Sequence, residues 1–375
     1  MLVPQLIIIK VKNRNRFIIS GGGTGGHIYP AISIANSLIK SIPDSEIKFI
    51  GAIGKMEMKI IPENGFKING LWISGIQRSL TLKNILVPIK LIVSVIHSIL
   101  IIISFKPKFV IGTGGFASFP IVFVASVFKI PTLIQEQNSI PGISNKLLSR
   151  FVKYISVSYN KMEKYFPENK IYLTGNPVRE SITKKINKDD IKKKYKVKED
   201  QLVVTILGGS LGSKKINEII KTNIEFLKSR NIFLIWQCGS LYYKSFKKFN
   251  SENIKVFDFL KNIDSVYISS DIIISRSGAL TLSELSIVGK PSILIPSPNV
   301  AENHQLYNAK TIEEKDACIC IEEKDLDLIF KNKLDLLIND RNLRNELSSN
   351  ILKLGRPNAN YDIVEIIKKH FGDDN

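Results

Sequence analysis

The chain has 375 residues, of which 53 are Lys or Arg and 34 are Asp or Glu, giving a formal net charge of +19 at pH 7. Hydrophobic residues make up 44% and charged residues 23%, which excludes a disordered chain, a collagen-like repeat and a disulfide scaffold. Residues 1–180 hold 22 of the basic and eight of the acidic residues, so the excess charge is concentrated in the first half. This asymmetry favours a polyanionic or membrane-surface partner, whereas a genome-wide preference for lysine would explain only the total.

The amino-terminal apolar run Leu6–Ile9 is too short for a signal-peptide core, so we expect no leader.

The sequence has three cysteines, Cys238, Cys318 and Cys320, a number that fits a reducing cytoplasm without a disulfide framework. Cys318 and Cys320 alternate along a predicted strand with no His or Cys pair nearby, which disfavours a structural zinc site.

From residue 17 onward, short β-branched runs alternate with helical stretches. The first run is followed by a glycine loop and by a predicted helix from about Tyr29 to Lys40. The strands predicted in the first half are Phe17–Ser20, Ile47–Ile50, Phe109–Gly112, Thr132–Gln135, Tyr154–Ser158 and Ile171–Thr174. Near-continuous apolar strands interleaved with helices indicate a parallel sheet covered on both faces.

The stretch Ile85–Phe105 is strongly apolar, yet its uncharged core begins only at Leu91. A helix that spans a bilayer needs about 20 such residues, and Pro88 and His97 weaken that interpretation further. Two interpretations remain: a buried helix of the α/β layer, or a helix lying at the membrane interface whose lysines meet anionic headgroups. The lysines concerned are Lys83, Lys90, Lys106 and Lys108.

The alternation pauses at Gly175-Asn176-Pro177 and restarts after a lysine-dense stretch. The later predicted strands are Leu202–Leu207, Ile232–Gln237, Ile254–Phe257, Ile272–Ser275 and Ile293–Pro296. The second half thus repeats the first, which predicts two Rossmann-like domains over residues 1–179 and 180–357. We expect a helix at about 358–375 to pack back on the first domain.

Two glycine loops occupy equivalent places after the first strand of each half. Gly21–His27 could hold an anion through glycine N–H groups and the positive end of the following helix. It matches neither the dinucleotide fingerprint nor the Walker loop, which disfavours a dehydrogenase and an NTPase. Gly208–Gly212 could bind a diphosphate through backbone N–H groups and the Ser210 hydroxyl. Two such loops predict a cleft that takes two substrates.

Other polar groups follow predicted strands, where open α/β sheets bind ligands. Ser275–Glu284 starts a helix, and Glu284 could accept hydrogen bonds from a diol such as a ribose, or simply stabilise the helix dipole. Glu302–Gln305 is a polar loop with groups that can bind sugar hydroxyls. In the first half, Gly112–Phe116 and Gln135–Asn138 occupy similar positions.

Six motifs in order resemble one family over about residues 16 to 370. They are Gly22-Gly23-Thr24-Gly25-Gly26-His27, Gly114-Gly115-Phe116, Glu136-Gln137-Asn138, Gly175-Asn176-Pro177-Val178-Arg179, Gly208-Gly209-Ser210 and Arg276-Ser277-Gly278-Ala279-Leu280-Thr281. Their combination resembles the undecaprenyldiphospho-muramoylpentapeptide β-N-acetylglucosaminyltransferases, which turn lipid I into lipid II in bacterial peptidoglycan synthesis.

The resemblance implies an α/β glycosyltransferase-B fold, UDP-N-acetylglucosamine as donor, a polyprenyl-diphosphate-linked muramoyl-pentapeptide as acceptor, and inversion at the anomeric carbon. It also implies a peripheral enzyme on the cytoplasmic face of the inner membrane, with an anionic membrane surface as partner and no obligatory metal or other cofactor.

Carried onto this sequence, the resemblance also assigns residues. The donor-contacting positions match Thr24, Gly25, Gly26, Asn138, Arg179, Ser210, Ala279, Leu280, Thr281, Leu282, Ser283, Glu284 and Gln305. Leu260 matches the position whose backbone reads the uracil edge, and His27, Glu136 and Asn145 match polar positions on the acceptor side. The chain departs from the family at Leu211, commonly Gln, and at Phe116, often Tyr.

An inverting transfer needs a base for the acceptor hydroxyl and a group that holds the leaving diphosphate. Because imidazole has an ordinary pKa of about 6.5, we expect His27 to be the base, with Glu136 as its orienter or as an alternative base. His27 could instead only position the acceptor. Helix N-termini and Ser210 would stabilise the leaving group without a metal.

Two other functions fit parts of the pattern. One is a nucleotide-sugar epimerase of the same fold. The other is a nucleic-acid-binding protein, which is disfavoured because the chain lacks a basic motif laced with arginine or aromatic residues.

Overall fold

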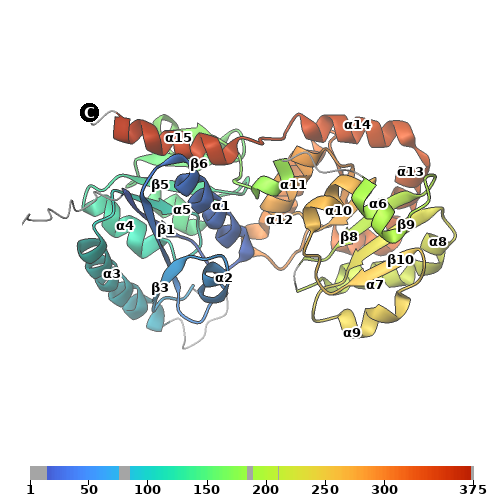
Figure 1. Ribbon diagram of the computed structural model, residues 1–375, viewed down its shortest axis with the longest axis horizontal. Helices are drawn as coiled ribbons and strands as arrows, with labels where there is room; N and C mark the ends of the chain where they lie inside the picture. The colour runs from blue at the N-terminus through green and yellow to red at the C-terminus, as the bar shows by residue number, and fades with distance from the viewer. Residues whose placement is uncertain (1–14, 76–84, 184–188, 210, 373–375) are drawn as a thin grey trace, which may run out of the picture.

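The computed structural model describes residues 15–75, 85–183, 189–209 and 211–372. The run Leu6–Ile9, Lys83 and Ser210 therefore lie outside the described residues. Two α/β units lie side by side, each built on a parallel sheet (Figure 1). The expected fold of two Rossmann-like domains is confirmed.

The first sheet has seven strands in the described residues, all paired in parallel, in the order β3-β2-β1-β4-β5-β6-β7. They are β1 (Asn15–Ser20), β2 (Ser45–Ala52), β3 (Lys67–Leu71), β4 (Phe109–Gly112), β5 (Thr132–Glu136), β6 (Tyr154–Val157) and β7 (Ile171–Leu173). The helices are α1 (Gly25–Ser41), α2 (Glu57–Glu63), α3 (Leu86–Phe105), α4 (Phe119–Val127) and α5 (Ile143–Leu148). We call this unit the N-terminal domain.

The second sheet has six strands in the described residues, in the order β10-β9-β8-β11-β12-β13. They are β8 (Leu202–Leu207), β9 (Ile232–Gln237), β10 (Ile254–Phe257), β11 (Ile272–Ser275), β12 (Ser292–Leu294) and β13 (Ile319–Cys320). The helices are α6 (Asp189–Tyr195), α7 (Lys214–Thr222), α8 (Ile224–Lys228), α9 (Tyr243–Phe246), α10 (Ile263–Ser269), α11 (Ala279–Val288), α12 (His304–Glu313), α13 (Leu326–Asn339) and α14 (Arg341–Leu352). We call this unit the C-terminal domain.

The central strands bury both faces, which explains their unbroken apolar sequences. In β1, Ile18 joins one hydrophobic cluster, whereas Phe17 and Ile19 join the cluster on the opposite face. In β8, Val204 and Val203 divide in the same way. Side chains alternate between faces along a strand, so each sheet needs a helical layer on both sides.

The last helix, α15 (Ala359–Gly372), leaves the C-terminal domain and lies over the N-terminal domain, where it contacts α1 (Figure 1). Its residues Ile363, Val364 and Ile367 are fully buried in the same cluster as Phe17 and Ile28. The chain therefore ends by tying the second half of the sequence to the first.

Two local details differ from the sequence prediction. The first helix begins at Gly25 rather than near Tyr29, because the first N–H groups of a helix need no partner within the helix and glycine is tolerated there. The edge strand β3 was not predicted, because its sequence Lys-Ile-Asn-Gly-Leu is rich in residues that are depleted in strands.

Helix α3 has an unusual distribution of polarity. It buries Ser94 and Ser98, whose hydroxyls donate to Trp72 O at 3.1 Å and Ser94 O at 2.7 Å, and it exposes Ile92, Ile96 and Leu100. It is the one described helix that is long and apolar enough to cross a membrane, which by itself is weak evidence. Because its buried face packs on α4 and β3, it combines features of both helix interpretations that the sequence left open.

Candidate active site

Four of the six motifs follow the strands at which each sheet changes its winding direction. In the N-terminal domain, β1 and β4 are neighbours, and the loops that follow them lead to α1 and α4. In the C-terminal domain, β8 and β11 are the equivalent pair, and their loops lead to α7 and α11. Such a switch point opens a crevice at the carboxyl ends of the strands, which is the usual ligand site of an open α/β sheet.

The first glycine loop is held by a buried acid, Glu57. Its carboxylate accepts the N–H groups of Gly23 and Ala52, both at 3.0 Å. Gly23 has a φ of +85°, a left-handed conformation that favours glycine. The loop comprises Gly21–Thr24, and Gly25 and Gly26 belong to the first turn of α1, with Thr24 and Gly26 exposed. The Gly23 N–H that could have contacted an anion is therefore already paired within the protein.

His27 lies in the first turn of α1, and its imidazole Nδ1 is 2.9 Å from Gln137 Oε1. Gly114, at φ +96°, leaves room for the ring, since a Cβ there would lie 2.9 Å from Nδ1. Removal from water lowers the pKa of His27, although hydrogen bonding to Gln137 and Thr113 and the charge of Glu57 act in the opposite direction. The imidazole is therefore neutral over a wider pH range than a free histidine.

The hydrogen bonds of Glu136 go to residues other than His27. Its Oε1 accepts the backbone N–H of Asn138 at 3.0 Å and the side-chain amide of Asn138 at 3.2 Å. Its Oε2 accepts Gly142 N at 3.1 Å and Asn145 Nδ2 at 2.8 Å. Burial raises the pKa of Glu136, and these hydrogen bonds oppose that rise. The sequence suggested Glu136 as the residue that orients the imidazole, but the residue that contacts the imidazole is Gln137.

Asn145 and Asn138 extend this cluster in two directions. Asn145 is buried on α5, and its Oδ1 has no hydrogen-bond partner within the described residues. A buried amide oxygen without a partner is costly, which makes it a suitable acceptor for a substrate group. Asn138 Oδ1 instead accepts Asn308 Nδ2 at 3.1 Å, so it links the cluster to α12 of the C-terminal domain.

Arg179 and Glu284, both expected to contact the donor, pair with each other. Arg179 Nε is 3.1 Å from Glu284 Oε1, and Asp264 lies at 3.7 Å. Burial raises the pKa of Glu284, whereas Arg179 and the Tyr267 hydroxyl oppose the rise. The pair joins the segment after Pro177 to α11, so the two residues form a contact between the domains.

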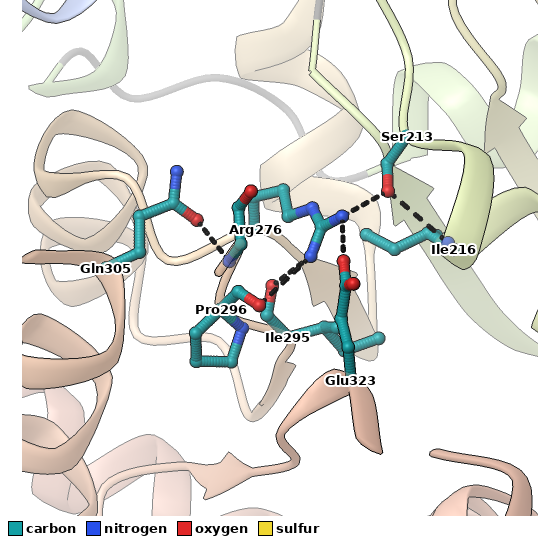
Figure 2. Close-up of polar contacts among 8 residues, drawn as sticks. Ser213, Ile216, Arg276, Ile295, Pro296, Gln305 and Glu323 are labelled. Carbon is teal, nitrogen blue, oxygen red and sulfur yellow. Dashed lines mark hydrogen bonds and ion pairs between the residues drawn. The ribbon is translucent and has the colours of Figure 1, made fainter. Parts of the chain in front are cut away.

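A pocket of about 650 Å³ lies against the second glycine loop, with described lining residues from the C-terminal domain alone. Arg276 crosses its wall, and Figure 2 shows how its guanidinium is held. Nη1 donates to the carbonyls of Ile295 and Pro296, both at 3.1 Å, and Nη2 donates to Ser213 Oγ at 2.6 Å and Glu323 at 2.5 Å. Arg276 therefore fastens three loops of the pocket together.

The remaining residues predicted to contact the UDP-sugar either line this pocket or lie in the core of the domain. Gln305 lines the pocket, and its Oε1 accepts Ser297 N at 2.9 Å, leaving its amide NH₂ as a donor. Leu260 and Leu282 have buried side chains in the domain core, so only their backbone could serve a ligand. The Leu260 N–H already donates to Gln237 Oε1 at 2.9 Å, which a base would have to displace.

The segment at the start of α11 also lies between the domains. Ser283 Oγ accepts Asn176 Nδ2 at 2.9 Å, and the Ala279 carbonyl is 3.5 Å from the same nitrogen. Ala279 is buried, whereas Leu280 and Thr281 are half-buried. The structure thus brings this segment to the Gly175-Asn176-Pro177 motif.

Four residues of this region had no assigned role in the sequence interpretation: Glu57, Gln137, Asn176 and Asn308. Gln137 and Asn176 lie inside quoted motifs, so their polar character was a usable signal. Asn308 is one helical turn beyond Gln305 on α12, and its Oδ1 accepts Ser139 N at 2.9 Å. Glu57 lies in a segment without a recognisable motif.

Comparison with known proteins places these features in a family. Residues 17–157 match the glycosyltransferase family 28 N-terminal domain, and residues 203–362 match the glycosyltransferase family 28 C-terminal domain. A UDP-N-acetylglucosamine–N-acetylmuramyl-(pentapeptide) pyrophosphoryl-undecaprenol N-acetylglucosamine transferase from Flavobacterium psychrophilum is 50% identical over 356 residues, which cover 94% of this chain and 97% of the relative. The protein of the same name from Cytophaga hutchinsonii is 47% identical over 350 residues, covering 93% and 95%.

Among solved structures, MurG from Acinetobacter baumannii aligns with a TM-score of 0.76 at 24% identity, covering 95% of this chain and 99% of that one. A UDP-GlcNAc 2-epimerase from Neisseria meningitidis aligns with a TM-score of 0.66 at 16% identity, covering 94% and 100%. At these identities the likeness shows the fold alone, which epimerases share. The sequence relatives decide the family: the chain belongs to glycosyltransferase family 28 and, within it, to the UDP-N-acetylglucosamine–N-acetylmuramyl-(pentapeptide) pyrophosphoryl-undecaprenol N-acetylglucosamine transferases.

Proposed function

We propose that the chain catalyses the reaction of its family with His27 as general base: transfer of N-acetylglucosamine from UDP-N-acetylglucosamine to the muramoyl 4-hydroxyl of lipid I, giving lipid II and UDP. The observation that carries the catalytic assignment is the desolvated imidazole of His27 at the sheet's switch point, near Asn145, whose Oδ1 has no partner among the described residues.

In this mechanism the neutral imidazole removes the proton of the 4-hydroxyl as its oxygen attacks the anomeric carbon. The bond between that carbon and the diphosphate oxygen breaks on the opposite side, so the sugar's configuration inverts. Since a base acts only when it is unprotonated, the lowered pKa of His27 keeps it competent near neutrality. Asn145 Oδ1 would accept a hydrogen bond from the acceptor.

The donor would occupy the pocket of the C-terminal domain. The amino end of α7, where Ser213 accepts Ile216 N at 3.3 Å, supplies a helix dipole beside the second glycine loop. Such fixed dipoles stabilise the negative charge that develops on a leaving diphosphate. The Gln305 amide would donate to a sugar hydroxyl, and Glu284 would accept from the ribose if its pairing with Arg179 opens.

The reaction is tested by incubating the protein with radiolabelled UDP-N-acetylglucosamine and a short-chain lipid I analogue. We expect labelled disaccharide lipid and equimolar UDP, and no conversion of the donor when the acceptor is left out. Acceptor-independent epimerisation of the sugar would instead assign the chain to the other chemistry of this fold, and binding of DNA at physiological salt would support a nucleic-acid partner.

We also propose that the N-terminal domain docks peripherally on the anionic cytoplasmic face of the membrane, where lipid I resides. The support is an apolar surface formed by α3, α4 and α5, of which α3 contacts α4 and α4 contacts α5. Its exposed side chains are Ile89, Ile92, Ile96, Leu100, Ile103, Val127, Phe128, Ile143, Leu147 and Phe151. Monomeric proteins rarely expose large apolar patches that have no function.

Helix α5 relates this surface to the site, because it exposes Ile143 and Leu147 and buries Asn145 against Glu136. If the domain binds the membrane through this surface, α5 lies at the depth of the lipid headgroups, next to the diphosphate and sugar of the acceptor. Lys106 at the end of α3 and Lys129 after α4 add positive charge that anionic lipids attract.

The docking is tested with the double variant Ile92→Glu/Leu100→Glu, whose side chains are 62% and 61% exposed. Full burial of such a side chain contributes about 1.5–3 kcal/mol, so losing two partly buried ones weakens vesicle binding by at least about tenfold. Leu328→Glu, at 80% exposure on α13, is the matched control. Equal binding of all three proteins to anionic vesicles would contradict the docking.

A further inference from the structure

A chain of buried amide side chains runs from the imidazole to the C-terminal domain, and its donors and acceptors can be assigned one by one. It consists of Gln137, Gln135 and Asn176, all at most 2% exposed, and it ends at Ser283 on α11. The orientation of a side-chain amide is set by its neighbours whenever one of them can only donate or only accept.

The assignment starts at a backbone carbonyl. Asn176 Nδ2 lies 3.1 Å from Gln137 O, which can only accept, so this atom is the NH₂ group and Oδ1 is the acceptor. Asn176 Oδ1 then receives Gln135 Nε2 at 2.9 Å and the Ser158 hydroxyl at 2.6 Å. Gln135 must therefore present its Oε1 to the next amide.

The next amide is that of Gln137. Its Nε2 donates to Gln135 Oε1 and, independently, to the Thr113 carbonyl at 2.7 Å. Two separate acceptors thus require the same orientation, in which Gln137 Oε1 faces His27 Nδ1 at 2.9 Å. Because an amide oxygen can only accept, the hydrogen of the neutral imidazole must be on Nδ1.

We infer that Gln137 is a positioning residue that holds His27 in the Nδ1–H tautomer, so that Nε2 is the nitrogen that accepts the proton of the acceptor hydroxyl. The inference deepens the proposed function and rests on it for the identity of that hydroxyl. The tautomer itself is a property of the protein alone.

A neutral partner suits a base that must stay unprotonated. A carboxylate at position 137 would favour the imidazolium and raise the pKa of His27, whereas an amide orients the ring without adding a charge. The charged side chain that acts on the imidazole from the described elements is Glu57 of α2, and its carboxylate already accepts two backbone N–H groups. Uncharged groups close to the imidazole include the backbone of Gly114 and Gly115, the Thr113 carbonyl and the amide of Asn145.

The tautomer can be observed directly by ¹⁵N NMR of protein labelled at histidine. The chain has four histidines, and the His27→Ala spectrum identifies the signals of His27. At pH 7.5 we expect Nε2 to show the shift of an unprotonated nitrogen and Nδ1 that of a protonated one, with a midpoint of titration below 6.5. A wild-type His27 in the Nε2–H form would overturn the inference without any variant and without an activity assay.

Gln137→Leu tests the cause. We expect a mixture of tautomers and a fall in kcat of at least about tenfold, less than the roughly 10²- to 10⁴-fold that a general base contributes, with KM for UDP-N-acetylglucosamine nearly unchanged. Gln201→Leu, which removes a buried amide remote from the site, should leave tautomer and kcat unchanged. An unaltered tautomer in folded Gln137→Leu would refute the role of Gln137, whereas full activity of His27→Ala would refute the base assignment and leave the tautomer result standing.

Discussion

Removing the guanidinium of Arg276 perturbs the pocket proposed for the donor, at the point where three of its loops meet. The side chain is 17% exposed and makes four hydrogen bonds, two to the carbonyls after β12, one to Ser213 at the start of α7 and one to Glu323. In Arg276→Ala the two carbonyls and the Glu323 carboxylate lose their donor. The loops that shape the pocket then lose the side chain that joins them.

The magnitude follows from these contacts. Hydrogen bonds to charged groups contribute about 1.5–3 kcal/mol each, but the four are not additive and water can replace part of them, so we expect a loss of about 3 kcal/mol in the free energy of unfolding. If about half of this free energy is lost from donor binding at the pocket, KM for UDP-N-acetylglucosamine rises about tenfold. The KM for the lipid acceptor should change little.

The assay combines urea unfolding with steady-state kinetics in both substrates. Arg230→Ala is the matched control, because Arg230 pairs with Asp335 at 2.5 Å just before β9, at the opposite end of the strands from the pocket. The two side chains are 37% and 34% exposed, and an ion pair that water reaches contributes about 0–1 kcal/mol. If Arg276→Ala unfolds as the control does and keeps the wild-type KM, the reasoning about the pocket is wrong.

Two further predictions concern the first glycine loop and the surroundings of the His27 imidazole, and both are checked by thermal unfolding and turnover. Glu57→Gln places an NH₂ group against one of the two backbone N–H donors that the carboxylate now accepts. We therefore expect the free energy of unfolding to fall by about 1–3 kcal/mol and kcat to fall as well. The control is Glu63→Gln, which removes an exposed ion pair with Lys59 and should change neither quantity. Gly114→Ala brings a Cβ to 2.9 Å from the imidazole of His27, so kcat should fall. The control is Gly54→Ala, where φ is also positive, at +73°, but the added Cβ meets no atom within 4 Å. This control should lower the stability and leave kcat unchanged. Equal turnover in the two alanine variants would contradict the close approach to the imidazole.

The sequence predicted the fold well because the signals were local. Central strands such as Leu202–Leu207 are buried on both faces and therefore read as unbroken apolar runs. The edge strand β3 escaped prediction because an edge strand can contain polar residues and glycine without exposing a core. The early start of α1 escaped because its first turn contains glycines, which usually mark a loop.

The sequence named most residues of the candidate site but not their pairings. His27, Glu136 and Asn145 were all assigned to the acceptor side, and Asn145 does donate to Glu136, yet neither spacing nor motif could tell that Gln137 would contact Nδ1 of His27. In β5 successive side chains alternate between the faces of the sheet, and the register at its end decides which residue of Gln135–Asn138 reaches His27. The contact of Asn138 with Asn308 needed the relative position of the two domains, which no local pattern contains.

The most direct test of the central claim compares His27→Ala with the wild type in transfer of labelled N-acetylglucosamine to a lipid I analogue, with donor affinity measured separately by calorimetry. A general base contributes about 10²- to 10⁴-fold, so we predict a fall of that size in kcat with the dissociation constant of UDP-N-acetylglucosamine unchanged. Transfer at the wild-type rate, or loss of donor binding in step with loss of turnover, would contradict the assignment of His27 as the base.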